Sequence, residues 1–354
     1  MSIVLITGSN GLVGSESSFF FLKKGFKVVG IDNNIRKKFF GLDGNTLWIK
    51  KKLRKYKQYY QYNFDIRNKE QLKKIFKKYN KNISIIIHAA AQPSHDYAKN
   101  NVFLDFEINA LGSLNVFNNA QIYCPKAKII HLSTNKVYGD NPNKIQLIEK
   151  KMRFEPLTKS FLKNGINEKF NIDNSIHSFF GASKAYSDLV AQEYGKNYGL
   201  KIGIFRAGCL TGPNHSGAGL HGFLSYLVKS CVINKSYQII GYKGKQVRDN
   251  LHSNDLIKAF WEFIKKPKNG EVYNIGGGKY SNCSIIEAIE LVEKRIKQKV
   301  KVKYLSKNRI GDHIWYISDL SKFKKHYPNW SVSFNTKSII NEIIDIYINK
   351  SYKK

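Results

Sequence analysis

The sequence predicts an α/β fold in which a doubly wound parallel sheet carries most of the chain. Residues 3–6 are apolar, 7–14 read T-G-S-N-G-L-V-G, an amphipathic segment runs to residue 24, and 26–31 form a second apolar run. Residues 82–88 form a continuous apolar stretch, which is typical of a strand buried on both faces of a parallel sheet. This pattern indicates a Rossmann-type fold. Since 354 residues exceed what one core usually holds, we also expect a smaller α/β substrate-binding lobe.

Two further strands, at residues 201–206 and 272–275, are expected to extend the main sheet, and a glycine triplet follows the second of them. We therefore expect a cofactor domain of residues 1–207 plus about 245–275, and a substrate lobe of residues 208–244 and 276–354.

The chain is strongly basic, with a formal charge of +33. Its lysines are scattered along the sequence, and the abundance of Lys, Asn, Ile and Tyr fits the codon bias of an AT-rich genome better than a binding surface. The densest basic tract, residues 50–55 with tyrosines at 56, 59 and 60, is the best place for a nucleic-acid site. We do not expect nucleic acid as the partner.

Apolar runs in this chain are shorter than the roughly 20 residues that a membrane span needs, and the N-terminus leads straight into the first strand. We therefore expect a soluble, cytoplasmic protein with no membrane partner. The four cysteines are widely spaced and include no C-x-x-C pair, so we expect neither a disulfide framework nor a metal site.

The glycines of the first turn have the spacing of a dinucleotide site. Gly8, Gly11 and Gly14 suit a tight turn, close approach of the backbone to a pyrophosphate, and close packing of helix on strand. Asp32 ends the second strand, where a carboxylate accepts hydrogen bonds from ribose hydroxyls and repels a 2′-phosphate. We therefore expect NAD rather than NADP as the cofactor. The expected contacts from this segment are Gly8, Asn10, Gly11, Leu12, Val13, Gly14, Asp32 and Asn33.

The spacing G-x-x-G-x-x-G, rather than G-x-G-x-x-G, resembles the extended short-chain dehydrogenase/reductase family, which contains nucleotide-sugar epimerases and dehydratases. In that family an acid after the third strand and its neighbour contact the adenine, small residues end the fourth strand, and an N-x-x-G helix follows. The resemblance implies further cofactor contacts at Asp65, Ile66, Ala89, Ala90, Ala91 and Asn109.

Residues 133–140, S-T-N-K-V-Y-G-D, match a signature of the sugar-nucleotide branch, which places Thr134 on the reacting sugar oxygen. The family also carries Y-x-x-x-K, in which the lysine holds the nicotinamide ribose and lowers the pKa of the tyrosine. Lys184 is present here, but Phe180 occupies the tyrosine position and cannot transfer a proton. Tyr186 is two residues past Lys184, about 200° around a helix, and points away.

Another group must then take the proton if the protein is an enzyme. The candidates are Thr134, His95, His177 and Ser178, or a water relay that reaches Lys184.

The second half of the chain carries motifs for the sugar nucleotide. R-D-N-L-H-S-N-D at residues 248–255 resembles the family segment whose arginine contacts the diphosphate, and residue 309 matches its second phosphate-binding arginine. The substrate contacts implied are Gln92, Thr134, Asn135, Asn214, Arg248 and Arg309.

The residues after Thr134 indicate which reaction to expect. Family 4,6-dehydratases carry Asp-Glu there for water elimination, whereas this chain has Asn135 and Lys136, so an epimerase is favoured. Several details, among them F-G-A-S-K and G-Y-K-G-K-Q-V-R-D, look like the subgroup of CDP-paratose 2-epimerases. That resemblance implies NAD-dependent inversion at C2 of a CDP-linked deoxyhexose for lipopolysaccharide O-antigen, in a homodimer or homotetramer.

Two alternatives remain open. One is another sugar-nucleotide redox enzyme of the family, such as a 4-epimerase, a decarboxylase or a reductase. The other is a catalytically impaired binder of a sugar nucleotide or nucleic acid, which Phe180 and the charge would suit. Nothing in the residues distinguishes cytidine from uridine.

Overall fold

The computed structural model describes residues 2–219, 221–308 and 311–351. The chain forms two compact units. Unit 1 comprises Met1–Val137, Ser178–Arg206 and Ile257–Tyr273, and unit 2 comprises Tyr138–His177, Ala207–Leu256 and Asn274–Lys354.

Unit 1 is built on a seven-stranded sheet in the order β12-β8-β5-β4-β1-β2-β3. The strands are β1 (Ile3–Thr7), β2 (Lys27–Ile31), β3 (Tyr59–Tyr62), β4 (Ile83–His88), β5 (Lys128–Thr134), β8 (Lys201–Ala207) and β12 (Glu271–Ile275). The pairs β2–β3, β1–β2, β1–β4 and β4–β5 are parallel. The order reverses between β1 and β4, and ligands bind at such a switch point, outside the carboxyl ends of the strands. The predicted Rossmann-type fold is confirmed.

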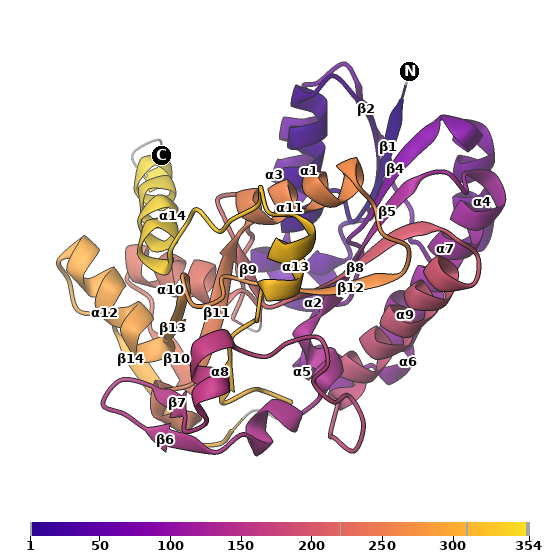
Figure 1. The fold of residues 1–354 in the computed structure, drawn as a ribbon. Coiled ribbons are helices and arrows are strands. Elements are labelled where there is room, and N and C mark those ends of the chain that lie inside the picture. The colour runs from indigo at the N-terminus through magenta and orange to yellow at the C-terminus, as the bar shows by residue number, and fades with distance from the viewer. Residues whose placement is uncertain (1, 220, 309–310, 352–354) are drawn as a thin grey trace. The chain divides into compact units, whose positions relative to one another are not determined.

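Helices cover both faces of this sheet (Figure 1). One layer contains α1 (Leu12–Lys23), α3 (Leu47–Leu53) and α11 (Ser253–Lys265), and the other contains α4 (Lys69–Tyr79), α7 (Gly112–Tyr123) and α9 (Ser178–Lys196). In the first layer, the ring of Phe20 on α1 lies 5.8 Å from that of Trp261 on α11. Shorter helical elements lie between these strands and helices along the chain: α2 (Arg36–Phe40), η1 (Gly41–Gly44), η2 (Asn80–Asn82), α5 (His95–Asn100), α6 (Val102–Phe106), η3 (Glu107–Leu111) and η4 (Asn135–Tyr138).

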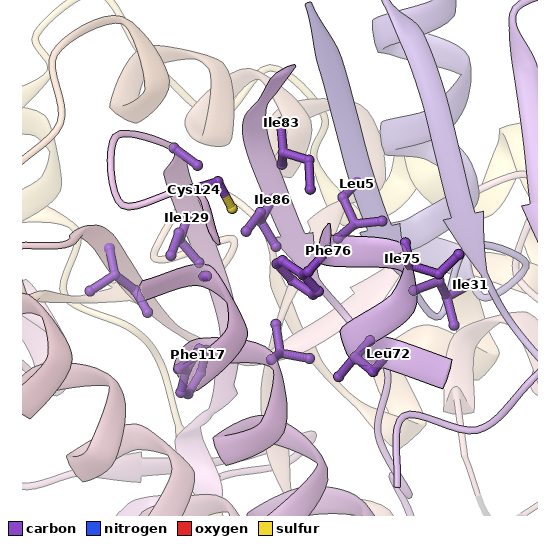
Figure 2. Packing of buried hydrophobic residues seen from close by; sticks show 14 of the residues in the cluster. Leu5, Ile31, Leu72, Ile75, Phe76, Ile83, Ile86, Phe117, Cys124 and Ile129 are labelled. Carbon is purple, nitrogen blue, oxygen red and sulfur yellow. The ribbon is translucent and has the colours of Figure 1, made fainter. Parts of the chain in front are cut away.

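The core under the α4–α7–α9 layer contains a large apolar cluster. Helix α4 shows why it forms: Leu72, Ile75, Phe76 and Tyr79 recur at helical spacing and are buried, while Asn68 caps its first turn by accepting the Gln71 N–H at 3.0 Å. Figure 2 shows the α4 side chains meeting strand residues such as Leu5 and Ile86. This packing fixes the carboxyl ends of the strands.

Unit 2 contains small sheets and a three-helix layer. Its strands are β6 (Leu147–Glu149), β7 (Phe154–Pro156), β9 (Cys209–Thr211), β10 (Tyr237–Ile240), β11 (Val247–His252), β13 (Asn282–Ser284), β14 (Val302–Leu305) and β15 (Trp315–Tyr316). Strand β11 pairs with β9, β13 and β15, β10 pairs with β14, and β6 pairs with β7. The helical elements are η5 (Asn141–Lys144), α8 (Lys159–Asn164), α10 (Phe223–Val232), η6 (Tyr242–Gly244), α12 (Ile285–Ile296), α13 (Ser321–His326) and α14 (Thr336–Ser351), of which α10, α12 and α14 pack together.

The compact units differ in extent from the domains that the sequence suggested. Residues 138–177 and 245–256 were assigned to the cofactor domain but fall in unit 2. Long-range contacts hold them there: the Phe154 N–H donates to Lys245 O at 3.0 Å, and the Tyr138 hydroxyl donates to Asn274 at 2.8 Å. Such pairings leave no local pattern in the sequence.

Among the described residues, no helix is long and apolar enough to cross a membrane. The four cysteines are free thiols, and the described part of the chain holds no group of three His, Cys, Asp or Glu side chains placed to bind a metal ion.

Candidate functional site

The turn after β1 is shaped by its glycines. Gly8 has φ +69°, and a Cβ there would lie 2.8 Å from the Ala90 backbone, while a Cβ on Gly14 would overlap the carbonyl of Gly8. Gly11 differs, because a Cβ would meet nothing closer than Gly8 O at 3.4 Å. Protein packing therefore explains Gly8 and Gly14, whereas Gly11 leaves open the side from which a pyrophosphate would approach.

Helix α1 begins with Leu12 and Val13, directly after Gly11. The first N–H groups of a helix lack partners within it and carry partial positive charge, so they bind phosphate oxygens well. The helix has no acidic residue in its first turn to compete for that role.

Asp32 sits beside this turn, where the Asn10 N–H donates to Oδ2 at 2.9 Å and the Asn34 N–H to Oδ1 at 2.8 Å. Burial raises the pKa of the Asp32 carboxyl, and these two N–H groups oppose the rise. The buried Asn10 Oδ1 has no hydrogen-bond partner among the described residues. A carboxylate with spare lone pairs and an unpartnered acceptor suit two ribose hydroxyls, so the residues present fit NAD.

A second set of predicted cofactor residues gathers at the ends of β2 and β3. The Asn33 amide donates to Asp65 at 3.0 Å, and Arg67 donates to Asp65 at 3.0 Å and to Glu107 at 2.7 Å. Burial raises the pKa of Asp65, but the hydrogen bonds from Arg67 and Asn33 outweigh it and leave the pKa below its usual value. Ile66 is buried, and a Cβ on Gly112 would clash with it. Asp65 is thus an ionised, oriented acceptor.

The end of β4 lies against the glycine turn. The Ala89 N–H donates to Thr7 O at 3.2 Å, and the Ala90 N–H to Thr7 Oγ1 at 3.3 Å. Ala89, Ala90 and Ala91 are all partly exposed. Their small side chains leave the backbone at this edge accessible to a ligand.

Gln92 and Asn109, predicted as ligand contacts, belong to a buried hydrogen-bond network. Asn109 exchanges bonds with the Gln92 backbone at 2.9 and 3.0 Å, and the Gln92 amide donates to Asp105 at 2.6 Å. Ser183 on α9 donates to the other Asp105 oxygen at 2.6 Å. The side chains of Gln92 and Asn109 are fully buried, and their hydrogen bonds hold the loop after β4 in place. Their direct contacts with ligands stay predictions.

Lys184 on α9 is buried, and its ammonium donates to Leu132 O at 2.8 Å. Burial lowers its pKa to about 8, against the attraction of Asp188 and Asp105. An ammonium has three donors, and the predicted contact of Lys184 with the ribose hydroxyls stays a prediction.

Asp188, one turn after Lys184, anchors the helix to the sheet. Arg206 grips it with two bonds of 2.8 and 3.0 Å, and Ser133 donates to it at 2.5 Å. We did not predict Asp188 or Arg206 from the sequence. The i, i+4 spacing from Lys184 to Asp188 was the only available signal, since it places both on one helical face.

Thr134 ends β5, and its hydroxyl accepts the Lys136 N–H at 3.2 Å. Asn135 follows in η4 and is largely buried. A hydroxyl held in this way keeps a fixed direction at the carboxyl edge of the sheet. The predicted contact with the sugar oxygen stays a prediction.

Phe180 packs edge-on against His95, with ring centroids 4.9 Å apart, and only 7% of its surface is exposed. The His95 Nδ1 lies 2.9 Å from the Ser178 hydroxyl. His177 belongs to unit 2, where its Nδ1 contacts Ser175 O at 3.1 Å. Of the predicted proton-transfer groups, His95 and Ser178 are thus in direct contact.

The predicted diphosphate site lies in unit 2. Arg248 is buried and forms an ion pair with Asp312 at 2.7 Å. Asn214 lies in the turn closed by the His215 N–H donating to Gly212 O at 3.1 Å. Arg309 lies outside the described residues.

Two stacked histidines lie near Lys184, with ring centroids 5.4 Å apart: His88 on β4 and His131 on β5. His88 bonds Thr7 at 2.7 Å and Ser113 at 2.9 Å, whereas neither ring nitrogen of His131 has a hydrogen-bond partner in the described part of the chain. Burial lowers the pKa of His88 to about 3 and that of His131 well below its usual value. Both rings are therefore neutral.

Residues 4–276 match the model of the NAD dependent epimerase/dehydratase family. CDP-paratose 2-epimerase of Salmonella typhi is 29% identical over 97% of this chain and 98% of its own. UDP-glucuronate 4-epimerase of Thermodesulfobacterium geofontis is 28% identical over 93% of this chain and 91% of its own.

A dTDP-glucose 4,6-dehydratase of Bacillus anthracis, solved with NAD, superposes with a TM-score of 0.76 at 22% identity, covering 99% of this chain and 98% of its own. A UDP-glucose 4-epimerase of Thermus thermophilus, also solved with NAD, gives 0.77 at 22% identity over 98% and 99% of the chains. Because the family model covers most of the chain, this protein belongs to the NAD-dependent epimerase/dehydratase family, the extended short-chain dehydrogenases/reductases.

Proposed function

We propose that the protein is an NAD-dependent epimerase of a sugar nucleotide, in which unit 1 binds the cofactor and unit 2 the nucleotide. One observation carries this proposal. The chain has both Lys184, whose ammonium is held near the end of β5, and Thr134, which is followed by Asn135 and Lys136. Without an acid and a base after Thr134, removal of water from the sugar has no catalyst in this segment. Oxidation and re-reduction of one carbon needs a base for the hydroxyl proton but no such acid–base pair after Thr134.

Bound NAD would supply the hydride acceptor and return the hydride within one turnover. The protein's own residues would hold it: the glycine turn the pyrophosphate, Asp32 and Asn10 the adenosine ribose, Asp65 the adenine side, and Lys184 the nicotinamide ribose. Thr134 would bind the reacting oxygen. Asp32 supports NAD over NADP because its carboxylate would repel a 2′-phosphate.

More specifically, we propose that the enzyme inverts C2 of a CDP-linked deoxyhexose, for lipopolysaccharide O-antigen synthesis. The similarity to CDP-paratose 2-epimerase along nearly the whole chain supports this choice over a 4-epimerase, a decarboxylase or a reductase. Arg248 would bind the diphosphate, exchanging Asp312 for a phosphate oxygen.

The test is to incubate the purified protein with a panel of CDP- and UDP-sugars and to assign the products by NMR. We expect a C2 epimer from a CDP-deoxyhexose, and from Arg248→Ala a loss of about 1.5 to 3 kcal/mol in sugar-nucleotide affinity by calorimetry. Products epimerised at C4 would show that the protein is a 4-epimerase and not a 2-epimerase. A protein that binds NAD and a sugar nucleotide but turns over none of the sugars would contradict the proposal that it is an enzyme.

The alternative is a catalytically impaired binder of sugar nucleotides, and Phe180 favours it. Phe180→Tyr separates the two. A large gain in turnover would mean that the natural protein is impaired, whereas no gain or a loss would mean that another proton path is built in.

We also propose a homodimer or homotetramer. Apolar side chains on α6 and α9 are exposed, including Phe103 at 84% and Leu189 at 47%, and the rings of Phe106 and Tyr186 lie 5.9 Å apart across the two helices. Burial of this face between copies would remove it from water. Light scattering tests this, and Phe103→Glu should favour the monomer. The cytoplasmic location stays a prediction.

A further inference from the structure

We propose that His95 takes the substrate's hydroxyl proton in place of the missing tyrosine, and that Ser178 is the positioning residue that fixes the tautomer of His95. This inference rests on the proposed function. It selects one path among the candidate groups and assigns a role to a serine that the family's motif leaves unassigned.

The first support is the geometry around residue 180. The His95 ring packs edge-on to the Phe180 ring at 4.9 Å, so it borders the position that a tyrosine side chain would occupy. The motif lysine, Lys184, is on the same helix as Phe180, one turn further along. A base at His95 therefore lies beside the place where the tyrosine hydroxyl would act.

The second support is the bonding of Ser178. Its Oγ lies 2.9 Å from His95 Nδ1 and accepts the Gly181 N–H at 3.2 Å. With Nδ1–H donating to the same oxygen, the serine uses both lone pairs as acceptors, and the proton-accepting lone pair of the imidazole lies on Nε2. Ser178 has φ +58°, a conformation that non-glycine residues rarely adopt, so the start of α9 is held in a strained geometry that presents this hydroxyl to His95.

The third support is the anchoring of the His95 loop. Ser94 caps α5 by accepting the Tyr97 N–H at 3.3 Å, and the Ser94 N–H donates to Gln92 Oε1 at 2.6 Å. Gln92 is in turn bonded to Asp105 at 2.6 Å. The loop is thus tied to the same buried network that holds Ser183 of α9, which keeps His95 and Phe180 in register.

The proton transfer balances as follows. The O–H bond of the sugar breaks, its proton forms the new Nε2–H bond of His95, and its electron pair forms the carbonyl as the C–H hydride leaves to the nicotinamide. On return of the hydride, His95 gives the proton back. A threonine hydroxyl cannot hold an extra proton near neutral pH, so Thr134 orients the oxygen and does not serve as the final acceptor.

His177 is the weaker candidate. Its Nδ1 is directed at Ser175 O, its own near neighbour, at 3.1 Å. His95, in contrast, contacts Ser178 on α9, and it follows Ser94, whose N–H donates to Gln92 in the network around Asp105.

The tautomer can be measured without a substrate by ¹⁵N NMR of the NAD-loaded protein labelled with ¹⁵N-histidine, with His95→Asn to assign the signal. We expect Nδ1 of His95 to be protonated and Nε2 unprotonated. Ser178→Ala should shift the proton to Nε2, and Ser178→Asn, which tolerates positive φ and keeps an acceptor oxygen, should restore the wild-type tautomer. A wild-type His95 protonated on Nε2, or one that Ser178→Ala leaves unchanged, overturns the proposal.

Turnover then tests the role of the base. His95→Ala should lower kcat at least tenfold with KM within about twofold, and added imidazole should restore part of kcat. His326→Ala, a histidine on α13 outside this pair, should match wild type and ignore imidazole. If added imidazole does not restore kcat to His95→Ala, His95 is not the base that takes the proton.

The two levels of the proposal fail differently. A wild-type protein that turns over sugar nucleotides but shows the wrong tautomer, or no rescue, refutes the His95–Ser178 pair alone. A wild-type protein with no turnover on any sugar of the panel refutes the proposed function, and the base with it.

Discussion

The glycine turn after β1 and the start of α9 prepare unit 1 for a ligand by different means. The turn works through backbone: Gly8 and Gly14 allow close packing within the protein, Gly11 leaves space for a ligand, and the first N–H groups of α1 supply partial positive charge. The start of α9 works through side chains, which must carry ionisable groups in a buried environment, as Lys184 does. The turn has no room for a side chain at Gly8 or Gly14, whereas α9 is held in place by side chains other than Phe180.

This difference explains how Phe180 can replace a tyrosine without loss of the fold. The side chain is buried and packed against His95, and the bonds that hold α9 in place run through Ser183, Lys184 and Asp188. None of these bonds involves the ring of residue 180. The scaffold of the site is thus independent of the group that takes the proton.

The largest effect is expected from Asp188→Asn, which would leave the buried Arg206 without its counter-charge. Loss of one partner from a buried pair costs about 3 to 5 kcal/mol, because the remaining charge is stranded. Urea unfolding at pH 7 measures this. The double variant Asp188→Leu with Arg206→Met should recover most of the loss. A single variant as stable as wild type would show that the charges are not what anchors α9.

The glycine turn offers a matched pair of substitutions. Gly14→Ala forces a Cβ into the Gly8 carbonyl and should cost about 1 to 3 kcal/mol of stability by overpacking. Gly11→Ala meets no protein atom closer than 3.4 Å, so stability should hold while NAD affinity falls about tenfold, or 1.4 kcal/mol. Calorimetry and thermal unfolding separate the two quantities. Undiminished NAD binding by Gly11→Ala would place the pyrophosphate elsewhere.

Acid should weaken unit 1 through its buried histidines. Burial lowers the pKa of His88 from 6.5 to about 3, so between these values the unfolded chain binds a proton that the folded chain does not. The stability from this group is complete above pH 6.5 and is lost as the pH falls toward 3, by about 2 kcal/mol between pH 7 and pH 5. His88→Gln should flatten this part of the pH profile of unfolding. An identical profile in the variant would contradict the assignment.

The smallest effect concerns Thr134→Val, which keeps the shape of the side chain and removes its hydroxyl. We expect kcat to fall at least tenfold, about 1.4 kcal/mol of barrier, because the sugar oxygen loses its hydrogen bond. NAD affinity should not change. A normal kcat would exclude Thr134 from the site and would contradict the role that we inferred for it from the family's signature.

The sequence predicted the parts of the site that depend on neighbours along the chain. The β1–α1–β2 segment, its glycines and Asp32 lie within one local unit, so their spacing is enough to fix their arrangement. Lys184 and Thr134 were found through family motifs of a few residues.

The long-range parts could not be read in the same way. Asp105 bonds Ser183 across 78 positions, and nothing local distinguishes it from a surface acid on an amphipathic helix. The same holds for Asn109 and Gln92: family motifs indicated them as ligand contacts, but no local pattern indicated the hydrogen-bond network around them. Residues 138–177 directly follow β5 and η4 in the sequence, which suggested that they belong with unit 1, but they fall in unit 2.

The π-helical turn η3 between α6 and α7 has a consequence for the register of this network. Gly112 N–H bonds Glu107 O, five residues back, so the chain holds one residue more than a regular α-helix would in the same length. Deleting a single residue from this turn would make the helix regular and rotate everything before it by about 100° relative to α7. Asp105 would then face away from Ser183, and the loop of His95 would lose the tie to α9 that runs through this network. A one-residue deletion here is therefore a register switch for the proton-transfer site that leaves the glycine turn intact.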